Sequence, residues 1–221
     1  IICFCHGEEG LGPTSPSRLQ KIKNWIATLT LAMTKFINIE VYMHIFSTSS
    51  NISIRQIAAH DIPAMLQAFR GASWPKPAAI FETYLQEQAA DSRLVWVAYV
   101  NDEFAGYVTL KWQSQYRPFA HGSIPEIMDL NVLPSFRKAG IASRLLDIAE
   151  KTAATKSNIV GIGVGLYAGS DGGYGAAQKL YVKRGYIPDG NGVTYNYQPV
   201  VPGGSYPFDD DLVLWLTKKL R

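Results

Sequence analysis

The sequence predicts a mixed α+β fold, and three observations lead to this prediction. Seven segments either alternate apolar with polar residues or are rich in β-branched and aromatic residues, as strands are. Four segments have the apolar spacing, the caps or the bounding breaks of helices. Their order is strand, two helices, three strands, helix, strand, helix and two strands, which combines antiparallel meanders with one or two crossover helices.

The elements of the first half follow from capping residues, helix breakers and residue type. Asp61 can cap a helix that runs to Arg70, because Asp is a favoured N-cap residue. Pro63 is tolerated in the first turn, and Gly71 ends the helix. The other elements of this half are a second helix at 78–89, strands at 52–57, 94–100, 104–112 and 127–133, and a loop at 113–125.

The second half contains the most regular helix, which is predicted to run from Ile141 to about residue 156. Its apolar residues, Leu145 and Ile148 among them, recur at helical spacing. The near-continuous apolar run at 158–167 is typical of a buried strand. The other elements are a helix at 174–184, strands at 186–197 and 211–218, and a loop rich in Pro and Gly at 199–207.

Length, charge and cysteine content narrow the classes of function. A chain of 221 residues supplies one good-sized core and little more. The net charge of +3 is too weak to indicate a nucleic-acid partner, although it suits a ligand that carries phosphates. Cys3 and Cys5 are the only cysteines and have no zinc-binding pattern around them, so no metal is expected. The cysteine-free remainder fits a reducing, cytoplasmic compartment.

The first fifty residues differ from the rest of the chain. No apolar run reaches the ~18 to 20 residues that a membrane span needs, so no membrane association is expected. The nearest run, at 25–46, is interrupted by four polar residues, which are Lys35, Asn38, Glu40 and His44. The N-terminus also lacks the basic start and unbroken apolar stretch of a signal peptide. We expect residues 1–50 to be an N-terminal extension, non-native or poorly ordered, and residues 51–221 to be the functional domain.

Residues 137–142, Arg-Lys-Ala-Gly-Ile-Ala, form the most informative stretch of the chain, between a predicted strand and a predicted helix. The first N–H groups of a helix have no partner inside it, and the helix dipole adds partial positive charge there. Arg137 and Lys138 add full charges, and Gly140 has no Cβ to keep a phosphate away from the backbone. The segment therefore indicates an anion site, and an ordinary helix start with surface cations is the alternative.

Two motifs resemble those of the GNAT superfamily of N-acetyltransferases. Residues 132–142 are similar to its acyl-CoA signature, in which Arg or Gln, two residues, Gly and one residue precede Gly or Ala. Residues 177–186 resemble the family's Ala-x-x-Leu-Tyr-x-x-x-Gly-aromatic segment. The resemblance covers about 51–221. It implies a splayed, mainly antiparallel seven-stranded sheet with helices on both faces, in which the fourth and fifth strands part to admit the pantetheine arm of the cofactor.

The resemblance implies that this cofactor is acetyl-CoA. Backbone N–H groups at 137–142 would hold its pyrophosphate, with charge from Arg137 and Lys138 and a hydroxyl from Ser143. Tyr174 departs from the family's pattern, because relatives often carry Asn there. The residues expected to contact the cofactor are Leu130, Val132, Arg137, Lys138, Ala139, Gly140, Ile141, Ala142, Ser143, Tyr174 and Ala177.

Acetyl transfer to an amine needs a base for the amine and an acid for the leaving thiolate. By resemblance Tyr181 is the candidate acid, and a core tyrosine is the alternative. Glu126 and Asp129 are the candidate bases, and each could equally be a solvated charge at a strand end. Strand alternation puts these two carboxylates on opposite faces, but the resemblance implies a bulge between them that would change this.

A glycine-rich run at 161–175 permits a different interpretation. Gly163, Gly165 and Ala168 fit a dinucleotide-binding fingerprint that follows a strand. The following helix is delayed, however, and no complete βαβ unit with an acidic residue about twenty positions further on is present. We expect instead that these glycines let the strand approach the pantetheine arm.

Together these features predict an acetyl-CoA-dependent N-acetyltransferase in which a primary amine attacks the thioester directly within a ternary complex. The acceptor would be a small-molecule amine or a peptide amine. Trp74, Trp112 and Tyr116 are candidate walls of its site, because aromatic rings attract ammonium groups, and the acidic run at 209–211 could attract a cation. The alternative is a non-catalytic acyl-CoA-binding sensor or interaction module. The resemblance also allows a homodimer.

Overall fold

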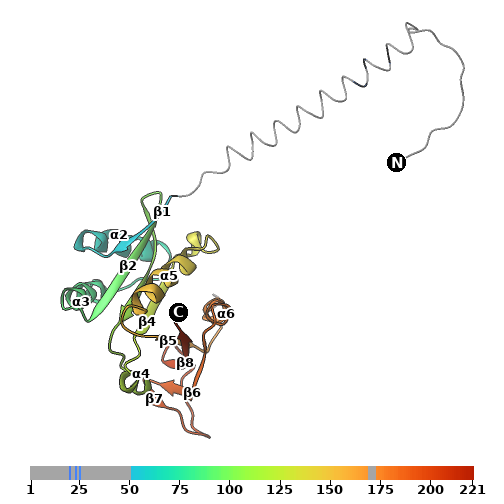
Figure 1. Ribbon diagram of the computed structural model, residues 1–221. Coiled ribbons are helices and arrows are strands. Elements are labelled where there is room, and N and C mark those ends of the chain that lie inside the picture. Colours follow the sequence, from blue (N-terminus) through green and yellow to red (C-terminus); the bar gives the residue numbers. More distant parts are fainter. Residues whose placement is uncertain (1–19, 21–22, 24, 26–50, 169–172) are drawn as a thin grey trace, which may run out of the picture. The chain divides into compact units, whose positions relative to one another are not determined.

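The computed structural model describes residues 51–168 and 173–221, together with residues 20, 23 and 25 (Figure 1). The chain divides into two units, Ile1–Ser50 and Asn51–Arg221. The predicted N-terminal extension coincides with the first unit and, apart from those three positions, lies outside the described residues. Within the described parts, no helix is long and apolar enough to cross a membrane.

The second unit is built on one sheet, whose strand order is β1-β2-β3-β4-β5-β8-β6-β7. Only β4 and β5 pair in parallel, which confirms the mainly antiparallel prediction. The sheet has eight strands instead of seven, because the chain turns back after Tyr195 and a two-residue strand pairs there. The strands are β1 Ile52–Gln56, β2 Arg93–Val100, β3 Glu103–Lys111, β4 Glu126–Val132, β5 Ile159–Gly165, β6 Ile187–Tyr195, β7 Gln198–Pro199 and β8 Leu212–Lys219.

The predicted helices are all present, and one further helix is found. The helices are α2 Ile62–Gly71, α3 Ala78–Ala89, α4 Arg117–His121, α5 Ile141–Ala153 and α6 Gly175–Lys183, with short 3₁₀ turns at Ala59–Asp61 and Pro134–Phe136. Helix α4 lies in the segment predicted as a loop, so that prediction was wrong for these five residues. Pro118 is compatible with its first turn, but five residues are too few to show a helical period in the sequence.

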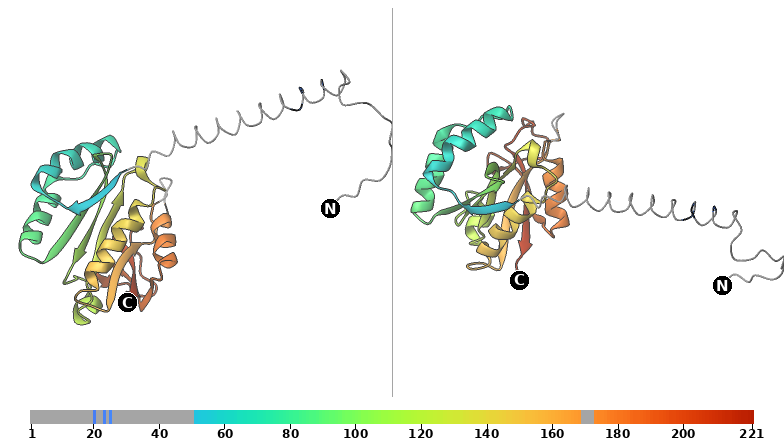
Figure 2. Two further views of the ribbon diagram at one scale, coloured as in Figure 1. Left: turned by 45° about the horizontal axis from the view of Figure 1, so that its top comes forward. Right: turned by 90° about the horizontal axis from the view of Figure 1, so that it is seen from above.

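Helices cover both faces of the sheet (Figure 2). Strand β2 shows why, because its alternate residues contribute to different cores. Val95 and Val97 pack in one core with the apolar residues of α2 and α3, which are Met65, Phe69 and Phe81. Trp96 and Ala98 pack in the other core with apolar residues of α5, including Ile141, Leu145, Leu146 and Ala149. Each such buried side chain contributes about 1.5 to 3 kcal/mol, so the two cores hold the central strands firmly between helices.

Asp61 occupies the N-cap position of α2, but its carboxylate does not cap the helix. A 3₁₀ turn precedes the helix and turns the side chain back, so that it accepts hydrogen bonds from Arg55, from Tyr99 and from the N–H of Ala58. Burial opposes ionisation, yet these hydrogen bonds lower the pKa of Asp61 to about 2. The prediction that Asp61 caps the helix was therefore wrong. Its carboxylate instead links the start of α2 to strands β1 and β2 through hydrogen bonds.

A bulge interrupts the pairing of β4 with β3. Thr109 pairs with Met128 and Tyr107 pairs with Asn131, so that two residues of β4 face one residue of β3. Asp129, the first extra residue, has a left-handed φ of 53°. A bulge of this kind bends its strand and redirects a side chain. It is the bulge that the family resemblance implied.

Strands β4 and β5 diverge soon after they meet. Their parallel pairing is limited to Glu126 with Gly161 and Ile127 with Ile162, although β4 continues to Val132 and β5 continues to Gly165. Beyond this point the facing edges of the two strands are not hydrogen-bonded to each other. The opening predicted between the fourth and fifth strands is therefore present, and the bulge at Asp129 lies beside it.

Candidate active site

The start of helix α5 combines left-handed backbone with free helical N–H groups. Lys138 and Gly140 have φ values of 66° and 79°. The helical ladder begins with the N–H of Arg144 bonded to the carbonyl oxygen of Gly140, which leaves the N–H groups of the first turn without a partner inside the helix. Successive N–H groups in such a conformation form a concavity that binds anions. Residues 137–140 are exposed, so an anion can reach it.

The side chains of the predicted cofactor residues differ in what they can contribute here. Arg137 and Lys138 present their charges to solvent, and Arg137 Nε also donates to the carbonyl oxygen of Val132 at 3.3 Å, which ties the turn to the end of β4. Ala139 and Ser143 can contribute their backbone N–H groups, which precede the first hydrogen bond of the helix at Arg144. The side chain of Ile141 is only 1% exposed and belongs to the core, so Ile141 can offer no more than its N–H group.

Three other predicted cofactor residues pack their side chains against the α5 core. Leu130 and Val132 do so from β4, and Ala177 does so from α6. Each of the three is half-buried. Leu130 and Val132 belong to the part of β4 that no longer pairs with β5, so their main chain faces the opening. These strand residues can therefore contact a ligand in the opening through their main chain.

Tyr181 is a buried tyrosine of helix α6, 5% exposed, with its ring 5.9 Å from that of Tyr186. Burial raises its pKa above the usual value, and the charge of Asp129 raises it further. The ring packs among the apolar residues of the α5 core. The phenol therefore stays protonated at neutral pH and retains a proton that it can donate.

Glu126 is the most strongly perturbed carboxyl group of the site. It is 3% exposed, and Ser114 Oγ donates a hydrogen bond to it. The N–H of Tyr116 in turn donates to Ser114 Oγ at 2.9 Å, which fixes the hydroxyl. Burial raises the pKa of Glu126 to about 7; the hydrogen bond from Ser114 opposes this rise, and the charge of Asp129 adds a smaller increase. A carboxyl group with this pKa can exchange a proton near neutral pH.

Asp129 is held by α3 and β2. Tyr84 Oη donates to its carboxylate at 2.6 Å, and Arg93 lies 3.9 Å away. Ile127 packs in the α5 core, so its neighbours Glu126 and Met128 face the other side of the sheet, where Arg93 contacts both Met128 and Asp129. The bulge thus removes the separation that simple alternation predicts. Tyr84, Arg93 and Ser114 were not predicted, because nothing in the sequence pattern marks contacts between such distant positions.

The glycines of β5 are used differently from the expectation. A Cβ at Gly161 would collide with the ring of Phe119, and one at Gly163 would lie 3.0 Å from the ring of Trp215. At Gly165 the obstacle would be the ring of Tyr174, whose hydroxyl donates to Asp210 at 3.0 Å. Aromatic rings of the chain itself therefore occupy this face of β5, where we expected pantetheine. Residues 169–172 of the glycine-rich run lie outside the described residues.

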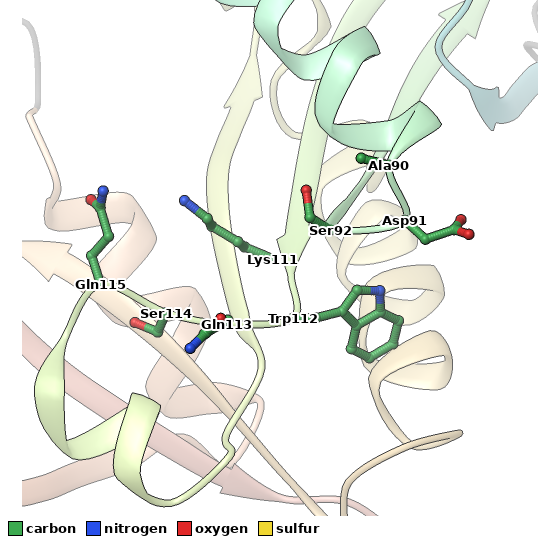
Figure 3. A pocket seen from close by; sticks show the side chains of 8 residues that line it. All are labelled: Ala90, Asp91, Ser92, Lys111, Trp112, Gln113, Ser114 and Gln115. Carbon is green, nitrogen blue, oxygen red and sulfur yellow. The ribbon is translucent and has the colours of Figure 1, made fainter.

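The three predicted aromatic walls do not form one site. Trp74 is 39% exposed and lies under the Lys76 ammonium at 4.7 Å. Trp112 lies under the Lys156 ammonium at 4.1 Å and borders a cavity of about 490 Å³ (Figure 3). Tyr116 is 2% exposed and stacks on Trp215, with ring centroids 4.1 Å apart. Of the three, only Tyr116 is joined by hydrogen bonds to a candidate catalytic residue, through Ser114.

The cavity of Figure 3 lies where β2 begins and β3 ends. Its lining residue Ser114 also contacts Glu126. The lining residues are Ala90, Asp91, Ser92, Lys111, Trp112, Gln113, Ser114 and Gln115. Within the described residues, no group of three or more His, Cys, Asp or Glu side chains is placed to hold a metal ion.

A mixed sheet that opens between β4 and β5, with exposed N–H groups at the start of α5 beside this opening, fits an acyltransferase. The sequence model of the Acetyltransferase (GNAT) family matches residues 60–186. The chain therefore belongs to the GNAT acetyltransferase family, as the two motifs indicated. Members of this family transfer acetyl groups from acetyl-CoA, their common cosubstrate. Among curated proteins, none matches the sequence significantly.

Solved structures with the same fold include several N-acetyltransferases. One, from Staphylococcus aureus Mu50, is 21% identical, with 78% of this chain and 100% of that chain covered and a TM-score of 0.56. A ribosomal-protein-alanine N-acetyltransferase from Brucella melitensis is 20% identical, with 76% and 99% covered and a TM-score of 0.55. The PaiA N-acetyltransferase from Thermoplasma acidophilum in complex with coenzyme A is 16% identical, with 76% and 99% covered and a TM-score of 0.50. At these identities the likeness establishes the fold alone.

Proposed function

We propose that the protein is an acetyl-CoA-dependent N-acetyltransferase in which a primary amine attacks the thioester directly. The observation that supports this most is the position of Asp129 at the bulge, beside the opening between β4 and β5. Its charge raises the pKa of both Glu126 and Tyr181, so all three groups lie within electrostatic reach of one another. A base and an acid are thereby available at one place, as acyl transfer to an amine requires.

The start of α5 fits the pyrophosphate of acetyl-CoA, which would supply the activated acetyl group as a thioester. Lys138 and Gly140 hold the left-handed backbone that turns the N–H groups outward, and the dipole of α5 favours an anion there. Arg137 and Lys138 add charge. The backbone N–H of Arg137 is bonded to the carbonyl oxygen of Pro134, so we assign the backbone N–H groups of 138–143 to phosphate binding. We assign the main chain of Leu130 and Val132 to the pantetheine arm. Ala177 and Tyr174 would border the arm from the α6 side.

Glu126 is the proposed general base. In water at neutral pH an aliphatic primary amine is an ammonium ion. It has no free lone pair for attack until it loses a proton. Because the pKa of Glu126 is raised to about 7, half of the carboxyl groups are ionised at neutral pH and each can still hold the proton it accepts. Asp129 is the weaker candidate, because its carboxylate already accepts a hydrogen bond from Tyr84 and lies 3.9 Å from Arg93.

Tyr181 is the proposed general acid. Its raised pKa keeps the hydroxyl protonated at neutral pH. It can therefore donate a proton to the departing thiolate sulfur. No cysteine lies in the described domain, so direct attack within a ternary complex is preferred to a covalent relay through a thiol. The acceptor is proposed to be a small-molecule or peptide amine, and the cytoplasmic location and the homodimer remain predictions.

A calorimetric titration with acetyl-CoA tests the proposal, with NADH as the control ligand. We expect micromolar binding of acetyl-CoA, none of NADH, and loss of binding in the Arg137→Glu/Gly140→Asp double variant. A panel of primary amines then follows, with release of CoA thiol as the readout. Absence of acetyl-CoA binding would refute the proposal at its first step. Tight binding without turnover of any amine would favour the alternative, a non-catalytic acyl-CoA sensor.

A further inference from the structure

Ser114 lies between the proposed base and the cavity of Figure 3. Its side chain is buried, and its Oγ donates a hydrogen bond to the carboxylate of Glu126. The same oxygen accepts the N–H of Tyr116 at 2.9 Å, so one contact fixes the hydroxyl and the other uses its hydrogen. Ser114 also lines the cavity, whose volume is about 490 Å³. One buried residue therefore contacts Glu126 and borders the cavity.

The cavity is polar and lies at the surface. Of its lining residues, Asp91, Ser92, Gln113 and Gln115 are exposed. A polar cavity of this size holds several water molecules, because one water occupies only about 10 to 15 Å³ of such volume. Waters that enter past exposed side chains exchange with the bulk solvent, so the cavity can carry protons away.

The proposed reaction releases one proton in each turnover. An ammonium group loses two protons when it becomes an amide, and one of them ends on the thiol of CoA. The other is taken up by Glu126 and has to leave before the next turnover. Because Glu126 is buried, its carboxyl group needs another group to pass this proton to water.

The hydroxyl of Ser114 is suited to this transfer, because a hydroxyl has one donor and two acceptor lone pairs. When Glu126 is protonated, its O–H can donate to Ser114 Oγ while the Ser114 O–H turns to a water in the cavity. The N–H of Tyr116 keeps the second lone pair throughout. The proton of Glu126 then moves to Oγ as the proton of the serine moves to the water, and the hydroxyl rotates back to the carboxylate.

The charged groups around Glu126 are less suited to this transfer. Lys111 pairs with Glu126 between β3 and β4 and also lines the cavity, but an ammonium group has three donors and no acceptor. Arg93 has the same limitation, since a guanidinium group only donates. Asp129 could accept a proton, but it does not line the cavity.

We propose that Ser114 is the proton outlet of Glu126, and that its hydroxyl passes the proton taken from the amine to water in the cavity. In this role Ser114 acts through Glu126, so it is a positioning residue. The inference rests on the proposed acetyltransferase function, because only a base that accepts a proton in every turnover needs an outlet.

Time-resolved infrared spectroscopy of the full chain, without acetyl-CoA or an amine, tests this role. Photolysis of ortho-nitrobenzaldehyde at pH 8 releases protons, and the carboxyl band that is missing in Glu126→Gln reports their uptake by Glu126. We expect Ser114→Ala to slow this uptake by at least about tenfold, as loss of a group that transfers protons does. Ser114→Thr keeps the hydroxyl and should remain within about threefold of the unaltered protein.

Proton uptake distinguishes an outlet from a hydrogen bond that only stabilises the charge of Glu126. Loss of such a bond would raise the pKa of Glu126 and slow proton release, but it would not slow uptake. Loss of an outlet slows proton transfer in both directions. A static titration of the same band measures the pKa of Glu126 in each variant.

Ser92→Ala is the matched control, because Ser92 lines the same cavity but its hydroxyl donates to the carbonyl oxygen of Glu87 at 3.1 Å. Its uptake rate should equal that of the unaltered protein. Unchanged uptake in Ser114→Ala, equal slowing in Ser92→Ala or Ser114→Thr, or the absence of a band that depends on Glu126 would overturn the proposal.

A second variant covers the case in which Ser114→Ala does not fold. Ser114→Cys has a side chain of similar size with only a weak S–H donor, so its uptake should be slowed as well, and a normal rate would contradict the outlet. Failure of the proposed function is seen separately. It would appear as absent acetyl-CoA binding in the calorimetric titration, whereas the infrared measurement uses no acetyl-CoA.

Discussion

At the residue scale, Glu126 connects burial with chemistry. Its pKa of about 7 means that the folded protein holds a proton that the unfolded chain releases near pH 4.5. Between these two values the native state binds more protons than the unfolded state, so this group makes stability fall as pH rises. The same raised pKa suits the proposed role of Glu126 as a base near neutral pH. Burial of this carboxyl group thus lowers the stability of the protein at high pH while it favours the proposed proton transfer.

Replacement of Glu126 by Gln should separate these two effects. We expect amine acetylation to fall by about 10²- to 10⁴-fold, the usual contribution of a general base. At pH 8 the free energy of unfolding should rise on the order of 1 to 3 kcal/mol, because no charge has to be buried. Urea unfolding at pH 5 and pH 8 measures the second effect.

In the unaltered protein, turnover should increase with pH through about pH 7. A flat profile would argue against Glu126 as the base.

Tyr181 is tested by removal of its hydroxyl alone. Tyr181→Phe should lower the rate of CoA release by about 10²-fold or more, with acetyl-CoA affinity unchanged, because the proposed role is proton donation and the ring packing is kept. Single-turnover kinetics and calorimetry on the same preparation give both values. Unchanged turnover would mean that Tyr181 is a core tyrosine. Tyr186→Phe is a suitable comparison, since the neighbouring hydroxyl is bonded to Glu150 and has no proposed catalytic part.

At the element scale, β5 illustrates how glycines shape the site. Gly161 lies opposite Glu126 in the parallel pairing, and the ring of Phe119 covers it. Helix α4 delivers that ring, and it also packs against Tyr116 with centroids 4.9 Å apart. The missing side chain at position 161 is therefore what lets the aromatic residues approach the proposed base.

Gly161→Ala should accordingly be disruptive. The added methyl group would overlap the ring of Phe119, so we expect a loss of about 1 to 3 kcal/mol in unfolding free energy, as for other overpacked cores. Turnover should drop as well, since the ring can only move toward Tyr116. Gly71→Ala is the control, because nothing lies within 4 Å of its added Cβ and Ala suits a helix end better. Denaturant titration of both variants measures the contrast, and equal stability would contradict the packing argument.

The same elements show what could be predicted from the sequence. Helix α3, Ala78–Ala89, was predicted at its observed bounds, because Pro77 precedes it and its residues favour a helix. The turn between β4 and α5 was also predicted, since its signal is contained in six adjacent residues; anion binding there stays a prediction. Helix α4 was missed because five residues show no period. The bulge at Asp129 was expected only from the family resemblance, because alternation does not reveal where a strand gains a residue.

Contacts across long stretches of chain were beyond prediction from pattern. Ser114 bonds Glu126 from twelve positions away, and Tyr84 bonds Asp129 from forty-five. Tyr197 contacts Trp215 only because the pairing of β6 with β7 and β8 brings the two rings together. Such pairs depend on how the strands are ordered in the sheet, which local residue types do not specify. The positions of the candidate acid and bases were therefore predictable, but their surroundings were not.

At the scale of the whole domain, the divergence of β4 and β5 weakens the joint between the two parts of the sheet. The parallel pair contributes only two rows of pairing there. Glu150 of α5 spans this joint from one side of the sheet. Its carboxylate accepts hydrogen bonds from Arg184 after α6 at 2.8 Å, from Lys218 of β8 at 2.6 Å and from the hydroxyl of Tyr186 at 3.1 Å. One buried carboxylate thus joins α5 to β8 and to the segment that follows α6.

Glu150→Ala should therefore loosen the joint as well as reduce stability. Removing one member of a buried charged cluster leaves Arg184 and Lys218 without their main partner, so we expect a loss of about 2 to 4 kcal/mol. Hydrogen exchange should accelerate more in β6 and β8 than in β2 and β3, because the former lose their tie to α5. Asp147→Ala is the matched control: Asp147 also pairs with Arg184 but is 65% exposed, and such pairs contribute about 0 to 1 kcal/mol. If both variants showed the same small, uniform change in exchange, the two rows of β4–β5 pairing and the surrounding core would suffice to hold the domain together. The sheet with its opening between β4 and β5 would then not depend on the contacts of Glu150 for its stability.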